Sequence, residues 1–335
     1  METERIAAEE SVLKKNSFIG LVEIALIAFV VFLNGLLIQT PLPDTWDWKY
    51  LDKYSQVIGD VAFLDAYLKH NPDSWEGYYA RAEAYEIDGI WTEVKANCDL
   101  AISKKNDEPA VYRLRAKAHY ALDENEKALA DYQYLIDSAN ANAEDWSHCS
   151  MINSRLGRFD QAIADANKAL EINHFWATAY QARAIAELEL GQFARAAEDA
   201  QKATRLYPSF TMPYVIMAAV YNENGEYKQA IEMCKTALNY DVVCGAAFWQ
   251  QGVAQNRLRQ YDDALSSLNF ALSLATNDNL RARAFASRAV SFMHLNKNAE
   301  ALDDCDAALA IDSAYKPALE TKQLLGETPR VPERN

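Results

Sequence analysis

Motifs for catalysis and for nucleotide or metal binding are missing from this sequence of 335 residues. It contains no G-x-S-x-G, no Walker-type phosphate loop, no GxGxxG and no H-E-x-x-H. Basic residues are fewer than acidic ones: the sequence has 33 Lys and Arg and 48 Asp and Glu, so the formal net charge is −15. Nucleic acid binding needs clustered Lys and Arg that displace counterions from phosphate. The composition therefore argues against catalysis and against a nucleic acid partner.

Cysteine and histidine are sparse, and their spacing is not that of metal ligands. The five cysteines are odd in number and form no CxxC pair, and the five histidines include no i, i+4 pair. Acidic pairs such as Asp262 with Asp263 lack the spacing of a calcium loop. We predict no catalytic residue, no cofactor and no metal. We expect the cysteines to be small core residues, not a disulfide framework.

A repeat of 34 residues dominates the chain. Aligned on Ala184, one position recurs with a small residue seven times, and the first five steps are 34 residues while the last is 37. The extra residues of that last step are expected in a lengthened loop at 276–279. A single helical hairpin cannot bury its apolar stripe, so hairpins of this kind must stack. The small residues are Ala82, Ala116, Ser150, Ala184, Ala218, Gly252 and Ala289.

A second series of alanines, from Ala128 to Ala301, keeps the same register at the start of the second helix of each unit. A helix–turn–helix of 34 residues with this pattern resembles the tetratricopeptide repeat (TPR), over about three quarters of the chain. Asp123, Arg259 and Asn296 depart from the pattern by replacing the turn glycine. The resemblance implies an all-α superhelical solenoid of seven repeats, with a degenerate leading half-repeat and a C-terminal capping helix.

The resemblance also implies where a partner would bind. In the family, the first helix of each repeat lines a concave groove that holds an extended or helical peptide. Asn222 and Asn256 are equivalent positions one repeat apart and could hydrogen-bond a peptide backbone. In the alternative interpretation, Trp249 and Met212 pack between neighbouring repeats and the amides are solvated. The predicted groove residues are Arg113, Lys117, Tyr120, Met151, Gln181, Ile185, Leu188, Met212, Val215, Ile216, Asn222, Trp249, Gln250, Val253 and Asn256.

An apolar run at 18–38, FIGLVEIALIAFVVFLNGLLI, has the length of a transmembrane helix. No small-residue cleavage site follows it, so we predict an uncleaved single-pass anchor. Glu23 and Asn34 fall on one stripe of this helix with Gly20, Ile27 and Val30. The stripe contacts another membrane helix, or Glu23 lies near one end and reaches the headgroups.

Lys14 and Lys15 adjoin the apolar run, which favours a cytoplasmic N-terminus and places the repeats across the membrane. The unpaired cysteines favour the alternative of cytosolic repeats. The predicted organisation is an N-terminal flank (1–17), a transmembrane helix (18–38), a linker (39–48), a degenerate leading repeat (49–74), seven repeats (75–314), a capping helix (315–325) and a disordered tail (326–335).

Two functions are compatible with these features. The first is a membrane-tethered, non-enzymatic scaffold or adaptor that binds a protein or peptide partner in its groove and assists assembly of a membrane or secretory complex. The second is an accessory subunit or receptor of a membrane complex, held mainly through its transmembrane helix.

Overall fold

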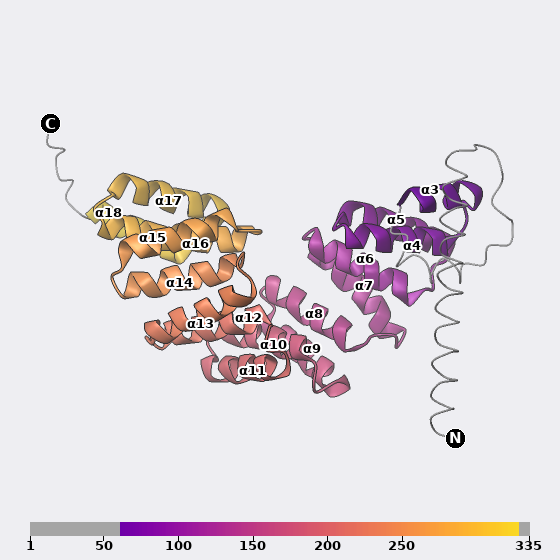
Figure 1. Ribbon diagram of the computed structural model, residues 1–335, viewed down its shortest axis with the longest axis horizontal. Coiled ribbons are helices and arrows are strands. Elements are labelled where there is room, and N and C mark those ends of the chain that lie inside the picture. Colours follow the sequence, from indigo (N-terminus) through magenta and orange to yellow (C-terminus); the bar gives the residue numbers. More distant parts are fainter. Residues whose placement is uncertain (1–60, 328–335) are drawn as a thin grey trace, which may run out of the picture. The chain divides into compact units, whose positions relative to one another are not determined.

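The structure is a computed structural model that describes residues 61–327, drawn as a coloured ribbon in Figure 1. Within this range the chain forms 16 α-helices and no strand. The predicted membrane span at 18–38, with its stripe of Gly20, Glu23, Ile27, Val30 and Asn34, lies outside the described residues. None of the helices between residues 61 and 327 has the length and apolar content needed to cross a bilayer.

Fourteen of the helices form seven consecutive pairs, and in each pair we name the first helix A and the second helix B. Helix α3 (Val61–His70) precedes the pairs, and α18 (Lys316–Glu327) follows them at the place of the predicted capping helix. The pairs are α4 (Trp75–Ile87) with α5 (Trp91–Lys104), α6 (Pro109–Ala121) with α7 (Asn125–Asp137), α8 (Ala143–Arg155) with α9 (Phe159–Ile172), α10 (Ala177–Glu189) with α11 (Phe193–Leu206), α12 (Thr211–Glu223) with α13 (Tyr227–Tyr240), α14 (Gly245–Arg257) with α15 (Tyr261–Ser273), and α16 (Asp278–His294) with α17 (Asn298–Ile311).

The turn inside each pair contains a residue in the left-handed region. Gly191 has φ +71°, and the amide of Gln192 donates to the Glu187 carbonyl at 2.8 Å, which closes helix α10. Asp123, Arg259 and Asn296, which replace the turn glycine, adopt φ values of 60°, 61° and 59°. The three turns therefore keep the left-handed backbone conformation without glycine, and each non-glycine residue there lowers the free energy of unfolding by about 1 kcal/mol.

Small side chains lie where helix A crosses helix B, as the period predicts. Ala184 and Ala196 are fully buried in one cluster with Ala200. Gly252 takes this role in the sixth pair, where an added Cβ atom would lie 2.5 Å from Cγ of Leu268. Close approach of the two helices is thus set by the residue at this crossing.

The insertion in the last repeat is placed differently from the expectation of a longer loop at 276–279. Helix α16 begins at Asp278 and is 17 residues long, whereas α14 has 13. The Asn277 side chain accepts a hydrogen bond from the amide of Leu280 at 2.9 Å and caps this helix. Most of the added length therefore extends helix A.

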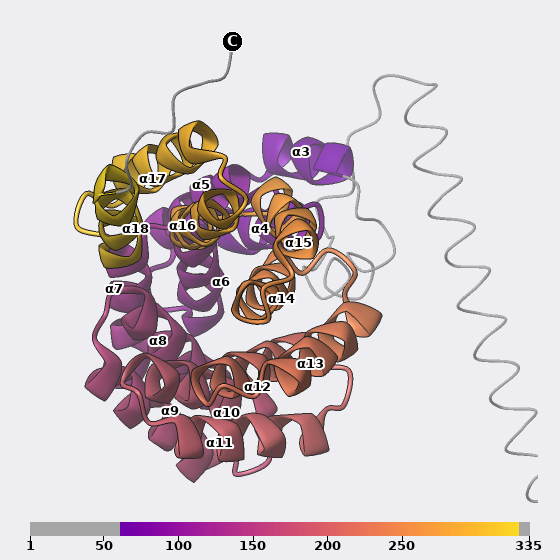
Figure 2. The same ribbon diagram turned by 90° about the vertical axis from the view of Figure 1, so that its left-hand side faces the viewer.

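Successive pairs stack in chain order. Helices α8, α10, α12, α14 and α16 pack side by side in that order, and each helix B from α9 to α15 also packs against the helix A that follows it. In Figure 2, α10, α12 and α14 lie closer to the inside of this arc than α11, which is at the bottom of the view. The A helices therefore present the inner surface on which the predicted groove residues were placed.

Candidate functional site

All fifteen predicted groove residues lie on A helices, namely α6, α8, α10, α12 and α14. They fall into three groups: buried residues, residues bonded to a neighbouring repeat, and a half-buried apolar set. The groups have different consequences for a partner.

Val215 and Ile216 are core residues, in contrast to the open positions expected from the sequence. Ile216 is 2% exposed and packs with Ala184 and Ala200 of the preceding pair. Val215 is 6% exposed and packs with Ala237 and Ala247. Because these side chains fill the space between repeats, they stabilise the stack and are not available to a ligand.

The amide side chains bridge neighbouring A helices, which replaces the expected contact with a peptide backbone. Asn222 Nδ2 donates to the Gln250 carbonyl at 3.0 Å and to its Oε1 at 2.8 Å. Asn256 Nδ2 donates to the Ser287 carbonyl at 2.8 Å, and its Oδ1 accepts from the Ser291 hydroxyl at 2.6 Å. Gln181 is also buried. These amides therefore fix the stacking of α12, α14 and α16.

The basic end of the predicted groove is neutralised by acids of the next pair. The Arg113 guanidinium donates to both carboxylate oxygens of Asp145, at 2.7 and 2.9 Å, and Asp145 is 1% exposed. The hydrogen bond to Asp145 raises the pKa of Arg113. Lys117 pairs with Glu144 at 3.1 Å, and Tyr120 lies beneath the guanidinium of Arg155 at 3.7 Å. An acidic peptide would have to displace these internal carboxylates.

Six half-buried apolar side chains remain on four consecutive A helices, and three of them, Ile185, Leu188 and Met212, also pack against the core formed by α10, α11 and α12. We call these six residues the inner strip. The Trp249 indole is held in place, because its Nε1 donates to the Ser287 hydroxyl at 3.0 Å and the Arg283 guanidinium lies 5.3 Å from its ring centroid. The inner strip consists of Met151 on α8, Ile185 and Leu188 on α10, Met212 on α12, and Trp249 and Val253 on α14.

An ion pair crosses the inner side beside this strip. Arg283 Nη2 on α16 lies 3.0 Å from Glu189 Oε1 at the end of α10, although 94 residues separate them in the chain. The pair joins the fourth repeat to the seventh. A 34-residue period describes contacts between neighbouring repeats only, so this contact could not be predicted from the periodic pattern.

Comparisons with known proteins agree with this architecture. Sequence models of the tetratricopeptide repeat match residues 146–173, 181–241 and 250–316. These segments between residues 146 and 316 are tetratricopeptide repeats. No curated protein matches this chain.

Two solved structures share this TPR fold at low sequence identity. In the Cut9–Hcn1 hetero-tetramer of the APC/C, the match has a TM-score of 0.63 at 18% identity and covers 79% of this chain and 52% of the other. A TPR protein from Parabacteroides merdae matches with a TM-score of 0.57 at 14% identity, over 75% of this chain and 98% of the other. This chain therefore spans about half the length of the first structure's chain, and these likenesses concern the fold.

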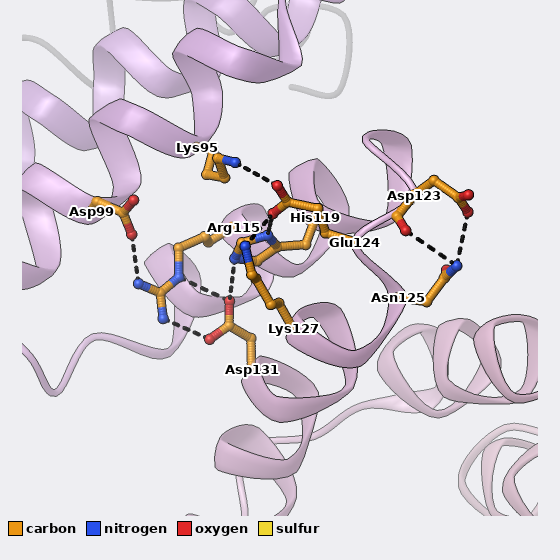
Figure 3. Close-up of polar contacts among 9 residues, drawn as sticks. All are labelled: Lys95, Asp99, Arg115, His119, Asp123, Glu124, Asn125, Lys127 and Asp131. Atoms are coloured by element: carbon orange, nitrogen blue, oxygen red, sulfur yellow. Dashed lines mark hydrogen bonds and ion pairs between the residues drawn. The ribbon is translucent and has the colours of Figure 1, made fainter. Parts of the chain in front are cut away.

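Charged residues at regular positions tie the TPR units together. Figure 3 shows Arg115 between Asp131, which it contacts through two nitrogens at 2.7 and 2.9 Å, and Asp99 of the preceding unit at 2.7 Å. The same spacing pairs Arg183 with Asp199 and Arg288 with Asp304. Asp131, Asp199 and Asp304 are buried, whereas Asp99 is exposed. The arginine of helix A therefore joins the two helices of its own unit.

A second part of the network in Figure 3 is centred on Glu124 in the turn of the second unit. Hydrogen bonds from Lys95 at 2.8 Å and His119 at 2.6 Å lower the pKa of Glu124 to about 2. Because Lys95 belongs to the first unit, this carboxylate also joins two repeats. All of these charges are engaged in binding neighbouring helices.

The cysteines of the described range, with its histidines and acidic residues, are the possible metal ligands. Within residues 61–327, no three His, Cys, Asp or Glu side chains are grouped as metal ligands. The five cysteines are free and buried. Burial raises the pKa of the Cys234 thiol to about 12, so it is protonated at neutral pH.

One buried carboxyl predicts a measurable dependence of stability on pH. Glu187 is 5% exposed, its Oε2 has no hydrogen-bond partner among the described residues, and burial together with the charge of Asp199 raises its pKa from 4.5 to about 7. The folded state thus binds this proton more tightly than the unfolded chain. Stability is expected to fall between about pH 4.5 and 7 and to change little from this group above pH 7.

Glu187→Gln should remove this dependence. We expect the variant to be more stable than the wild type at pH 8 by about 2 kcal/mol, with a smaller difference at pH 5. Urea unfolding at the two pH values measures the effect, and the exposed Glu223→Gln on α12 is the matched control. An equal effect of Glu187→Gln at both pH values would contradict the assignment.

Proposed function

We propose that this protein is a non-enzymatic TPR scaffold, tethered to a membrane by residues 18–38, that binds a segment of a partner protein on its inner strip. TPR domains bind protein or peptide partners. The observation that carries the proposal is the half-buried apolar surface of Met151, Ile185, Leu188, Met212, Trp249 and Val253 on successive A helices. Partly exposed apolar side chains on adjacent helices are typical of an interaction site.

The chemistry of the inner strip favours an apolar partner segment. The basic residues at one end are paired with Asp145 and Glu144, so they offer little net charge. Trp249 is fixed by its hydrogen bond to Ser287, and a rigid aromatic side chain loses little entropy on binding. The segment would therefore contribute apolar side chains, and the indole would be its main anchor.

Tethering explains how a modest contact surface becomes effective. A membrane anchor turns binding to a membrane-bound partner into an effectively intramolecular step and raises the local concentration. This arrangement suits the assembly of a membrane or secretory complex. In this proposal, Lys14 and Lys15 favour a cytoplasmic N-terminus, so the repeats lie on the other side of the membrane. Protease accessibility in sealed vesicles distinguishes this orientation from the alternative in which the repeats are cytosolic.

Trp249→Ala is expected to weaken partner binding about 30-fold or more, because an aromatic anchor in an interface contributes about 2 kcal/mol or more. The partner is first identified by cross-linking in membranes followed by mass spectrometry. Its co-purification with the variant is then measured. Phe270→Ala, which removes an aromatic side chain that is 56% exposed on α15, is the control. Equal recovery of the partner with both variants would refute binding at the inner strip.

A second function is favoured by the polar stripe of the apolar run. Glu23 and Asn34 would contact another membrane helix if the protein were an accessory subunit or receptor held through its anchor. In that case Glu23→Leu with Asn34→Leu should release the protein from its complex, while Trp249→Ala should leave the complex intact. Blue-native electrophoresis of the two variants separates the alternatives.

A further inference from the structure

Three successive connections between repeats expose apolar side chains to solvent. They join α9 to α10, α11 to α12, and α13 to α14. Phe175 is 65% exposed, Tyr207 61%, Tyr240 50%, Val242 73% and Val243 61%. We call these five residues the apolar edge. None of them belongs to the inner strip.

The repeat architecture does not require apolar residues at these places. Asp107 occupies in the first connection the position that Phe175 and Val243 occupy in theirs, and the segments 104–108 and 137–142 contain no large apolar residue. These connections join equally well-formed helices. Large exposed apolar side chains also occur elsewhere, as at Ile87, but among the connections between the described repeats they are confined to these three adjacent ones, which indicates an interaction surface.

The exposed side chains are held outward by ordered loops. The Tyr180 hydroxyl donates to the His174 carbonyl at 3.1 Å, and the Tyr214 hydroxyl donates to the Pro208 carbonyl at 2.9 Å. The amide of Phe175 donates to Asn173 Oδ1 at 3.0 Å. These bonds order the loops before anything binds, which lowers the entropic cost of association.

The three connections lie on one edge of the repeats. Each leads into the N-terminus of an A helix, and these helices, α10, α12 and α14, pack side by side. Phenylalanine, tyrosine and valine on neighbouring loop tips make a surface that is apolar and carries two phenolic hydroxyls. Aromatic side chains of this kind are enriched at the boundary between lipid and water, where the ring is buried and the hydroxyl is hydrated.

Charge around the apolar edge also fits a lipid surface. The chain as a whole carries −15, whereas near the three connections Lys168, Lys202 and Arg205 are balanced by Glu171, Glu198 and Asp241. Lys168 lies 2.8 Å from Glu171, and Lys202 lies 2.8 Å from Glu198. Repulsion from anionic headgroups is therefore weaker here than the net charge suggests. Residues 39–60 separate the predicted membrane span from the first described residue, and these 22 residues would span at most roughly 70 Å when fully extended.

We propose that the apolar edge rests on the lipid surface and so fixes which side of the repeats faces the bilayer. This inference depends on the membrane tether of the proposed function. With the edge at the lipid, the inner strip stays open to a partner beside the membrane. Tyr207, Phe175 and Val242 enter the interfacial region, while the polar connections of the first two repeats remain in water.

A probe on one of the loops tests the contact in the full-length chain. Ser209→Cys places a single exposed thiol in the middle connection, since the five native cysteines are buried, and the thiol is labelled with an environment-sensitive fluorophore. The protein is reconstituted in vesicles of phosphatidylcholine and phosphatidylglycerol with brominated acyl chains. We expect the emission to shift to the blue and to lose most of its intensity through bromine quenching.

Asp107→Cys is the matched control, because it carries the same label at the same position of a polar connection, and its probe should stay unquenched. Combining Phe175→Ser, Tyr207→Ser and Val242→Ser should abolish quenching at Ser209→Cys while the protein still sediments with vesicles. Sedimentation without quenching of the Ser209→Cys probe would overturn the inference, as would a blue shift that appears only when a protein partner is added. A chain that does not sediment with vesicles would instead refute the tether.

Discussion

Arg183→Met is expected to destabilise the repeats by about 3–5 kcal/mol, because it leaves a buried carboxylate without its cation. Asp199 is 3% exposed, and Arg183 contacts it through Nε at 2.5 Å and Nη2 at 2.9 Å. Arg183 also donates to Asn167 of the preceding repeat at 2.5 Å. Lys202, 3.8 Å from Asp199, is too distant to replace these bonds. Urea unfolding followed by circular dichroism measures the loss.

The fifth repeat supplies the control for this substitution. Met217 and Met233 occupy there the positions that Arg183 and Asp199 occupy in the fourth repeat, so the fold accepts an apolar pair. Arg183→Met combined with Asp199→Met should therefore recover most of the lost stability, since both charges are replaced by packed side chains. If the double variant is as unstable as the single one, the ion pair has a role beyond charge compensation.

The register of the fold could be predicted from the sequence because a period of 34 residues fixes which positions meet. Helices α10 and α11 cross at Ala184 and Ala196, as expected. The turns at Asp123, Arg259 and Asn296 keep the left-handed conformation despite the missing glycine. These are local consequences of side-chain size and backbone geometry. They need no knowledge of how one repeat pairs with the next.

Accessibility of the candidate site could not be predicted in the same way. Whether Asn222 faces a ligand or bonds to Gln250 depends on the side chain that the neighbouring repeat brings to the same place. The pairing of Arg283 with Glu189 depends on how far the stack turns over three repeats, which accumulates from small rotations. A periodic pattern identifies the helix face, but it does not specify the partners that occupy it.

Leu268→Ala is expected to cost about 2–5 kcal/mol, because Leu268 is fully buried at the crossing of α14 and α15 and its removal leaves a cavity. Its neighbour across the crossing is Gly252, whose missing Cβ leaves room for the leucine. In the fourth repeat, Ala184 and Ala200 divide the equivalent space between them. The sixth repeat thus fills this crossing with one large and one very small residue, whereas the fourth repeat fills it with two alanines.

The two positions should be strongly coupled. Gly252→Ala alone forces its Cβ to within 2.5 Å of Cγ of Leu268, and the strain of about 1–3 kcal/mol cancels or exceeds the gain of about 1 kcal/mol in helix propensity. In the Leu268→Ala background the clash is gone, so the same substitution should stabilise by about 1 kcal/mol. A double-mutant cycle by urea unfolding measures the coupling. Because a change of sign is expected, additive effects would show that α14 and α15 shift apart freely and that side-chain size does not set their spacing.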